Sequence, residues 1–251
     1  MNRLKLIWLN ITFYTLLVMF SLTAIPLLLL LIGCQVPFST RRRVLRLTRL
    51  SITWYGSIII NRLPRPLVRI CYENFTNGCS PLPAIVVLNH KSSSDPFLIA
   101  ALPLGETIQI ANTWPFRLPV WGIIARLAGY LSIKEMPMES FMKAAGQLLR
   151  EGVCLATFPE GTRAGTGQMG QFHGALFRLA LQEKAPIIPV CILGNEHTPP
   201  RGTGILRPAI IKVRQLPALV WDDYKDMTPF HLKNHVRALI ARELKSMEAL
   251  P

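Results

Sequence analysis

A histidine and an aspartate stand five residues apart in the segment Asn89–Pro96, which reads NHKSSSDP. A neutral imidazole such as that of His90 can take a proton from a hydroxyl group, and the Asp95 carboxylate can orient the ring and stabilise the imidazolium. Five residues within one helix would turn the two side chains about 140° apart, so a bent loop must bring them together. The alternative is that Asp95 only caps a helix, followed by Pro96 at its first position, and that His90 is an ordinary loop residue.

A second polar segment, Phe158–Arg163, reads FPEGTR. A turn that contains glycine exposes backbone N–H groups, and the Arg163 guanidinium can bind an anion with two parallel donors. The alternative is a polar turn in which Glu160 and Arg163 pair with each other. The stretch Gly165–Gly174 holds four glycines but lacks the spacing and the Lys-Ser/Thr ending of a nucleotide-binding loop.

Both segments follow short apolar runs that predict buried strands, and helical stretches alternate with these runs. We predict strands over Ala84–Leu88, Thr107–Ala111, Val153–Phe158 and Ile187–Leu193, and helices over Phe97–Leu102, Met138–Arg150, Gly174–Glu183 and Thr228–Leu250. Alternation of this kind is typical of an α/β fold with a mixed, largely parallel sheet flanked by helices. Because the carboxyl ends of parallel strands meet at one edge, the two polar segments should lie there together.

The N-terminal region predicts a membrane-embedded helical element. Leu6–Gly33 is a run of 28 residues without a charge, longer than the roughly 20 needed to cross a bilayer and longer than the apolar part of a secretory signal. Residues 31–34 also resemble a lipoprotein cleavage site, although an arginine cluster follows at once. Pro26 leaves both a tilted span and a re-entrant helix open.

The next segment, residues 40–60, predicts a basic amphipathic helix lying at the membrane surface, with a surface helix of the globular domain as the alternative. Arg42, Arg46 and Arg49 share one face, and the opposite face carries the apolar side chains of Val44, Leu47, Trp54 and Ile58. The excess of arginine after the apolar run places the following residues, and the active site, on the cytoplasmic side, at the inner membrane in a bacterium. We expect residues 1–60 to anchor the chain, 61–82 to be a linker, and 83–251 to be the catalytic domain.

The distribution of charge also indicates a lipid partner and argues against nucleic acid. The net charge is +14, and residues 1–72 hold ten basic and no acidic side chains, so most of the excess flanks the apolar run. Basic residues beside a membrane segment favour anionic lipid. The five cysteines show neither a C-x-x-C pair nor a companion histidine spacing, so we expect no bound metal.

The two polar segments together resemble the hallmark motifs of the glycerolipid acyltransferases, the family typified by lysophosphatidic acid acyltransferases (1-acylglycerol-3-phosphate O-acyltransferases). Asn89-His90 and Asp95-Pro96 match the first motif, and residues 158–163 match the second residue for residue. A third, Ile/Val-Pro-Val, is matched by residues 188–190, and the resemblance covers about residues 82–215. It implies an N-terminal hydrophobic helical element and an enzyme of phospholipid biosynthesis.

The resemblance also implies roles for individual residues. His90 would deprotonate the acceptor hydroxyl, which attacks the thioester of acyl-CoA or acyl carrier protein, the co-substrate; no other cofactor is implied. Asp95 would orient His90. The acceptor headgroup would be bound by Glu160, Gly161, Thr162 and Arg163.

Three positions depart from members of the family that act on phosphate-bearing acceptors. Glu135 stands where an arginine is common, and Asn112 and His173 stand where lysines are common. Lys134, Arg117 and Arg163 would compensate as headgroup ligands. The resemblance makes 1-acylglycerol-3-phosphate the default acceptor, which would give phosphatidic acid. The three departures favour the alternative, a non-phosphate acceptor such as a lyso-ornithine or other lyso-aminolipid.

Two other classes of function compete with acyl transfer. A lipid esterase would use Ser94 or Thr162 as its nucleophile, but the chain lacks the Gly-x-Ser-x-Gly turn. A non-catalytic lipid-binding protein would have no use for the two complete motifs.

Overall fold

The computed structural model describes residues 2–76, 80–111, 113–117, 119–162, 169–200 and 202–249. Its contacts divide the chain into two compact units. Unit 1 comprises Met1–Cys71, Ser92–Pro103 and Gly194–Ile211, and unit 2 comprises Tyr72–Lys91, Leu104–Leu193 and Lys212–Pro251.

Within the described ranges, the strands form one six-stranded sheet in the order β1-β6-β5-β2-β4-β3. The four strands β2, β3, β4 and β5 belong to unit 2, where β2 is parallel to β4 and β5, and β3 is parallel to β4. β6 pairs antiparallel with β5, so the sheet is mixed and largely parallel as predicted. The strands are β1 (Val68–Asn74), β2 (Ile85–Leu88), β3 (Thr107–Ile110), β4 (Cys154–Thr157), β5 (Ile187–Leu193) and β6 (Ala209–Gln215).

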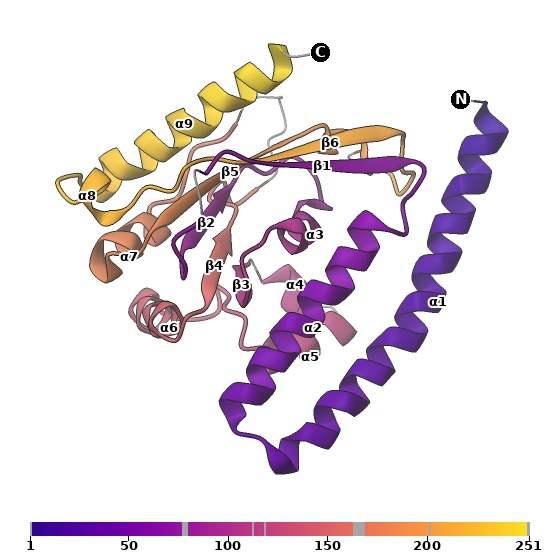
Figure 1. The fold of residues 1–251 in the computed structure, drawn as a ribbon, viewed down its shortest axis with the longest axis horizontal. Coiled ribbons are helices and arrows are strands. Elements are labelled where there is room, and N and C mark those ends of the chain that lie inside the picture. The colour runs from indigo at the N-terminus through magenta and orange to yellow at the C-terminus, as the bar shows by residue number, and fades with distance from the viewer. Residues whose placement is uncertain are drawn as a thin grey trace. The chain divides into compact units, whose positions relative to one another are not determined.

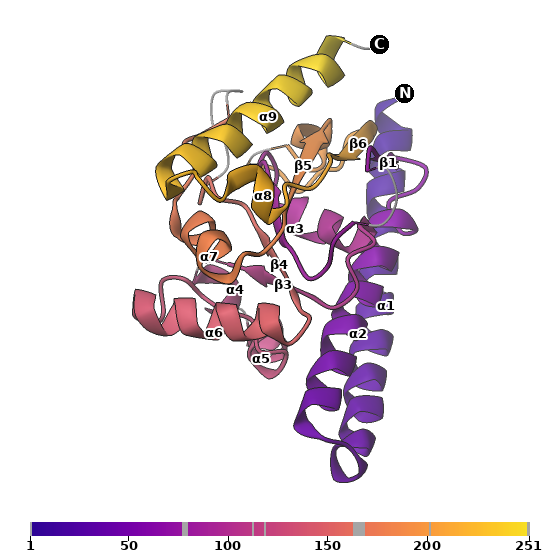
Figure 2. The ribbon, with the colours of Figure 1, turned by 60° about the vertical axis from the view of Figure 1, so that its left-hand side comes forward.

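In unit 2, three helices cover one face of the sheet: α6 (Met138–Arg150), α7 (Ala175–Glu183) and α9 (Pro229–Ala249) (Figures 1 and 2). Alternate strand side chains, such as Ile85 and Val87 of β2, join the buried core beneath these helices. α9 starts as predicted, because Pro229 is its first residue and the Thr228 hydroxyl accepts the His231 N–H at 3.2 Å. The shorter helices of this unit are α4 (Trp114–Arg117), α5 (Pro119–Leu127) and α8 (Trp221–Tyr224).

In unit 1, the long helices α1 (Arg3–Gln35) and α2 (Arg41–Asn61) lie side by side (Figure 2). The Tyr55 ring stacks on Phe20 at 5.3 Å between centroids, and its hydroxyl bonds with that of Ser21 at 2.6 Å. This polar bond satisfies two hydroxyls inside an otherwise apolar contact. The other elements are α3 (Asp95–Leu98) and the 3-10 turns η1 (Val36–Phe38), η2 (Ile99–Ala101) and η3 (Asn195–His197).

Most of the apolar surface of α1 is exposed. Leu22 is 71% and Leu30 63% exposed, and the segment Arg3–Phe38 is long and apolar enough to cross a bilayer. Asn10, Phe13 and Ala24 are nevertheless buried. The Asn10 amide exchanges two hydrogen bonds with the backbone of Leu206. Those bonds remove the cost of placing an asparagine in an apolar helix.

The structure differs from the sequence-based expectations in two places outside the site. Residues 61–82 were expected to be a linker, but they contain β1, whose N–H and C=O groups pair at the edge of the sheet. Arg49 was expected to share a basic face of α2 with Arg42 and Arg46 at the membrane surface, but it is buried. The buried side of α2 instead runs through Thr48, Tyr55 and Ile59, because this side packs on α1, α3 and η2.

Candidate active site

The two sequence motifs begin at the carboxyl ends of neighbouring parallel strands in unit 2. β2 ends at Leu88, directly before Asn89-His90, and β4 ends at Thr157, directly before Phe158. The two strands pair in register, with Val87 opposite Thr157. The edge of an open α/β sheet at the carboxyl ends of its strands is where such folds bind ligands.

The Glu160 carboxylate bonds to the backbone of two separate segments. Its Oε1 accepts the N–H of His90 at 2.7 Å, and its Oε2 accepts the N–H of Gly170 at 2.7 Å. The side chain is only 7% exposed. Charge-assisted bonds of this length are strong, and a buried carboxylate needs them. The structure thus gives Glu160 an internal role that the sequence did not predict, while headgroup binding by Glu160 stays a prediction.

Asn89 fixes the residue before His90. Its side-chain amide donates to the Ile192 carbonyl at 2.9 Å, and its carbonyl oxygen accepts the Ile192 N–H at 2.7 Å. The backbone pairing of β2 with β5 ends at Leu88 and Val190. The fully buried Asn89 amide replaces the next pair of backbone hydrogen bonds with side-chain ones. This explains an asparagine directly before the histidine.

Aromatic packing and a tight turn shape the surroundings of His90. Its ring packs against Phe158, with 4.7 Å between centroids. Gly161 has φ of +69°, a conformation that favours glycine, and a Cβ there would lie 3.0 Å from Nε2 of His173. Glycine therefore lets His173, whose N–H donates to the Pro159 carbonyl at 2.8 Å, pack against the turn.

Asp95 lies in unit 1, where it is completely buried. Its Oδ2 accepts the Ser92 N–H at 2.8 Å, and its Oδ1 accepts a bond from the side-chain amide of Asn195. The helix begins one residue earlier than the capping alternative requires: Ser94 is the N-cap and Asp95 is the first residue of α3. The carboxylate thus bonds to the preceding loop and to Asn195.

Asn195 was missed by the sequence analysis. It is fully buried, and its Oδ1 accepts the Thr198 hydroxyl at 2.6 Å, which leaves its NH₂ group directed at Asp95. The signal available in the sequence was its place, two residues beyond the apolar run that forms β5. The Ser94 hydroxyl, considered as an esterase nucleophile, donates to the Thr198 carbonyl at 2.5 Å.

The remaining predicted site residues are either exposed or lie outside the described residues. Thr162 is exposed beside Gly161, and Lys134 is exposed in the turn at residues 133–135. Arg163 and Asn112 lie outside the described residues. Headgroup binding by Thr162, Arg163 and Lys134 therefore stays a prediction.

In the part of the chain that the structure describes, the buried cysteines and the possible metal ligands do not form a second candidate site. Burial raises the pKa of the Cys191 thiol to about 12 and also raises that of Cys154, so neither is a thiolate at neutral pH. Among the described residues, no group of three His, Cys, Asp or Glu side chains could hold a metal ion.

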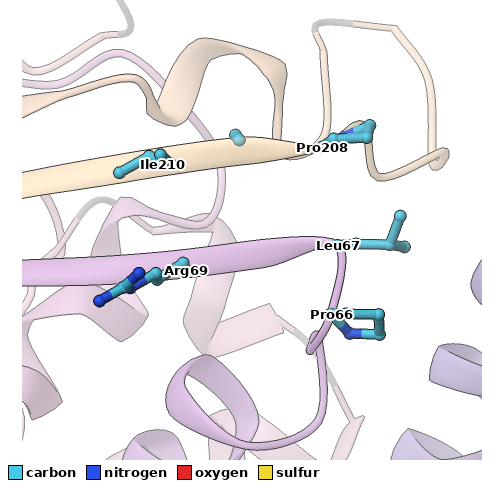
Figure 3. Close-up of a pocket in the computed structure, with 6 residues that line it drawn as sticks. Pro66, Leu67, Arg69, Pro208 and Ile210 are labelled. Atoms are coloured by element: carbon cyan, nitrogen blue, oxygen red, sulfur yellow. The ribbon is translucent and has the colours of Figure 1, made fainter. Parts of the chain in front are cut away.

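A shallow pocket lies in unit 1 between the first residues of β1 and β6 (Figure 3). It contains none of the motif residues. Its lining is Pro66, Leu67, Arg69, Pro208, Ala209 and Ile210.

The chain is similar in sequence to known acyltransferases. Residues 69–193 match the acyltransferase family model. The chain is 32% identical over 146 residues to a 1-acyl-sn-glycerol-3-phosphate acyltransferase of Limnanthes alba, covering 56% of this chain and 52% of that protein. It is 30% identical over 165 residues to the protein of the same name from Cocos nucifera, covering 64% and 54%. The chain thus spans about half the length of these curated relatives.

The fold is also that of a solved structure. The crystal structure of the 1-acyl-sn-glycerophosphate acyltransferase PlsC from Thermotoga maritima superposes with a TM-score of 0.80 at 20% identity, covering 99% of this chain and 98% of that one. The family match spans β1 to β5 and includes both motifs. The chain therefore belongs to the acyltransferase family.

Proposed function

We propose that this protein is a membrane-associated O-acyltransferase that moves a fatty acyl group from acyl-CoA or acyl carrier protein to the free hydroxyl of a lysolipid. The observation that carries the proposal is the placement of His90 and Glu160 after two paired parallel strands, within the matched acyltransferase domain. The named relatives support 1-acylglycerol-3-phosphate as the default acceptor and phosphatidic acid as the product.

In the proposed reaction, the His90 imidazole takes the proton of the acceptor hydroxyl as its oxygen attacks the thioester carbonyl. The new C–O bond forms, the C–S bond breaks, and the imidazolium returns its proton to the departing thiolate. Asp95 orients His90, as the family resemblance implies. No acyl-enzyme is needed, so the chemistry requires neither a serine nor a cysteine nucleophile.

One observation favours the alternative acceptor. Glu135 is exposed in the turn beside Lys134, where members of the family that act on phosphate carry an arginine. A carboxylate repels a phosphate and attracts an amine, so Glu135 suits a lyso-aminolipid such as lyso-ornithine lipid.

Membrane association is part of the proposal, and the exposed apolar surface of α1 supports it. The arginines at the start of α2 suit anionic headgroups. Since these arginines follow α1, we place the catalytic domain on the cytoplasmic side.

The test is an assay of the full-length protein with labelled acyl-CoA or acyl carrier protein, with and without a lysolipid. Diacyl product that forms only with an acceptor is the expected result, and lysophosphatidate and a lyso-aminolipid compared side by side identify the headgroup. Free fatty acid released at the same rate without acceptor would instead identify an esterase, and neither product would identify a binding protein.

A further inference from the structure

We propose that Arg237, on the C-terminal helix α9, is a positioning residue for His90 and Glu160. Its guanidinium donates from Nε to the Gly170 carbonyl at 2.8 Å and from Nη2 to the Met169 carbonyl at 2.7 Å. All of these residues belong to unit 2. A planar guanidinium that binds two consecutive carbonyls fixes both the position and the orientation of that backbone.

The backbone that Arg237 holds is the same one that binds Glu160. The carbonyl of Gly170 accepts from Arg237, and the N–H of Gly170 donates to Glu160 Oε2 at 2.7 Å. A Cβ at Gly170 would lie 3.1 Å from Glu160 Oε2, so the approach is close. The Met169 carbonyl and the Gly170 N–H belong to one peptide group, so the bond from Arg237 Nη2 and the bond to Glu160 Oε2 polarise each other.

Glu160 passes this constraint to the catalytic motif through its other oxygen, which accepts the His90 N–H at 2.7 Å. The connection therefore runs from Arg237 to the backbone at residues 169–170, then to the Glu160 carboxylate, and then to the backbone of His90. If Gly170 moved away, Oε2 would lose its donor and the carboxylate would be held through Oε1 alone. His90 would then lose a fixed point on its backbone.

The helix that carries Arg237 is itself firmly held. Val236 and Ile240, which flank it on the buried face of α9, are both fully buried in the core. α9 packs on β5 and on α7. Arg237 is thus a rigid support, and it connects the C-terminal helix to a site about 150 residues earlier in the chain.

The test compares Arg237→Met with Arg242→Met. Arg242 lies on the same helix but is exposed, so its replacement removes the same charge without touching residues 169–170. We expect Arg237→Met to lower kcat/KM about tenfold, the typical effect of losing a charge-assisted hydrogen bond, and Arg242→Met to leave it unchanged. Arg237→Lys, which keeps the charge but not the planar fork, should lie between the two and serves if the methionine variant does not fold.

Two further measurements separate positioning from a general loss of stability. Amide hydrogen exchange at Gly170 and His90 should become faster in Arg237→Met and not in Arg242→Met. In a Glu160→Ala background, Arg237→Met should cause no additional loss of kcat/KM, because the connection is already broken. The proposal would be overturned if Arg237→Met lowered kcat/KM by the same factor with and without Glu160→Ala. It would also be overturned if amide exchange at His90 did not change in Arg237→Met.

The measurement of kcat/KM rests on the proposed function, whereas the measurement of amide hydrogen exchange needs no substrate. Wild-type protein that transfers no acyl group would contradict the proposed function alone. If the wild-type protein is active but amide exchange at His90 is the same in Arg237→Met as in the wild type, only the proposed role of Arg237 is contradicted.

Discussion

The Glu160 carboxylate accepts a 2.7 Å hydrogen bond from the backbone N–H of His90, a residue that lies 70 positions earlier in the chain. The two sequence motifs are therefore joined through a side chain of one and the backbone of the other. Glu160→Gln would place an NH₂ group against the N–H of either His90 or Gly170. We expect a loss of about 1–3 kcal/mol in the free energy of unfolding, measured by urea denaturation.

The control for this substitution is Glu183→Gln. Glu183 pairs with Arg150, whose side chain is 59% exposed, so its replacement should cost less than about 1 kcal/mol. Equal losses in the two variants would show that the Glu160 bonds have no special importance.

His90→Ala should abolish acyl transfer while leaving the fold intact. General base catalysis contributes about 10²–10⁴-fold. His90 lies in the loop after β2, outside the helices and strands of unit 2. The measurement is kcat/KM with the preferred acceptor, together with circular dichroism and the thermal midpoint. Activity within threefold of the wild-type value in a folded variant would rule out His90 as the base.

Asn195→Leu should impair catalysis through Asp95. The leucine keeps the volume but removes the amide that donates to the buried carboxylate. Asn10→Leu is the matched control, because Asn10 is also buried and bonds only to backbone at Leu206 and Leu6. We expect both variants to lower the thermal midpoint, but only Asn195→Leu to lower kcat, by roughly tenfold. A kcat that falls equally in both would indicate general destabilisation.

Glu135→Arg tests the acceptor headgroup. If Glu135 faces a phosphate, the arginine should raise the efficiency of lysophosphatidate acylation roughly 10–150-fold and lower that of a lyso-aminolipid. For an amine-bearing natural acceptor, the wild-type protein should already favour the lyso-aminolipid. The measurement is kcat/KM with both acceptors for both proteins. Identical values throughout would mean that residue 135 does not contact the headgroup.

Leu22→Lys should weaken membrane retention, whereas Leu4→Lys should not. The two leucines are similarly exposed, at 71% and 74%, but Leu22 is near the middle of α1 and Leu4 is at its end. A lysine at the centre of a membrane helix costs about 2.5–3.5 kcal/mol, and one at the end reaches the headgroups. Flotation with anionic vesicles would measure the effect. Equal retention of both variants would argue against a membrane location for α1.

The alternating α/β pattern and the two motifs at strand ends could be predicted from the order of the amino acids. β5 and α6 have the predicted bounds. A long apolar run indicates a buried strand, and apolar residues at helical spacing indicate a helix with one buried side. The edge strand β1 escaped prediction, since its seven residues mix charged and apolar types and only pairing with a neighbour makes them a strand.

The groups that hold the motif residues in place were found in the folded chain and could not be predicted. Glu160, Asn195 and Arg237 make bonds to residues 67 to 100 positions away, and no local pattern of sequence encodes such distances. Whether a carboxylate binds a ligand or two backbone amides depends on what the fold places within 3 Å of it. That is a property of packed segments that only the folded chain brings together.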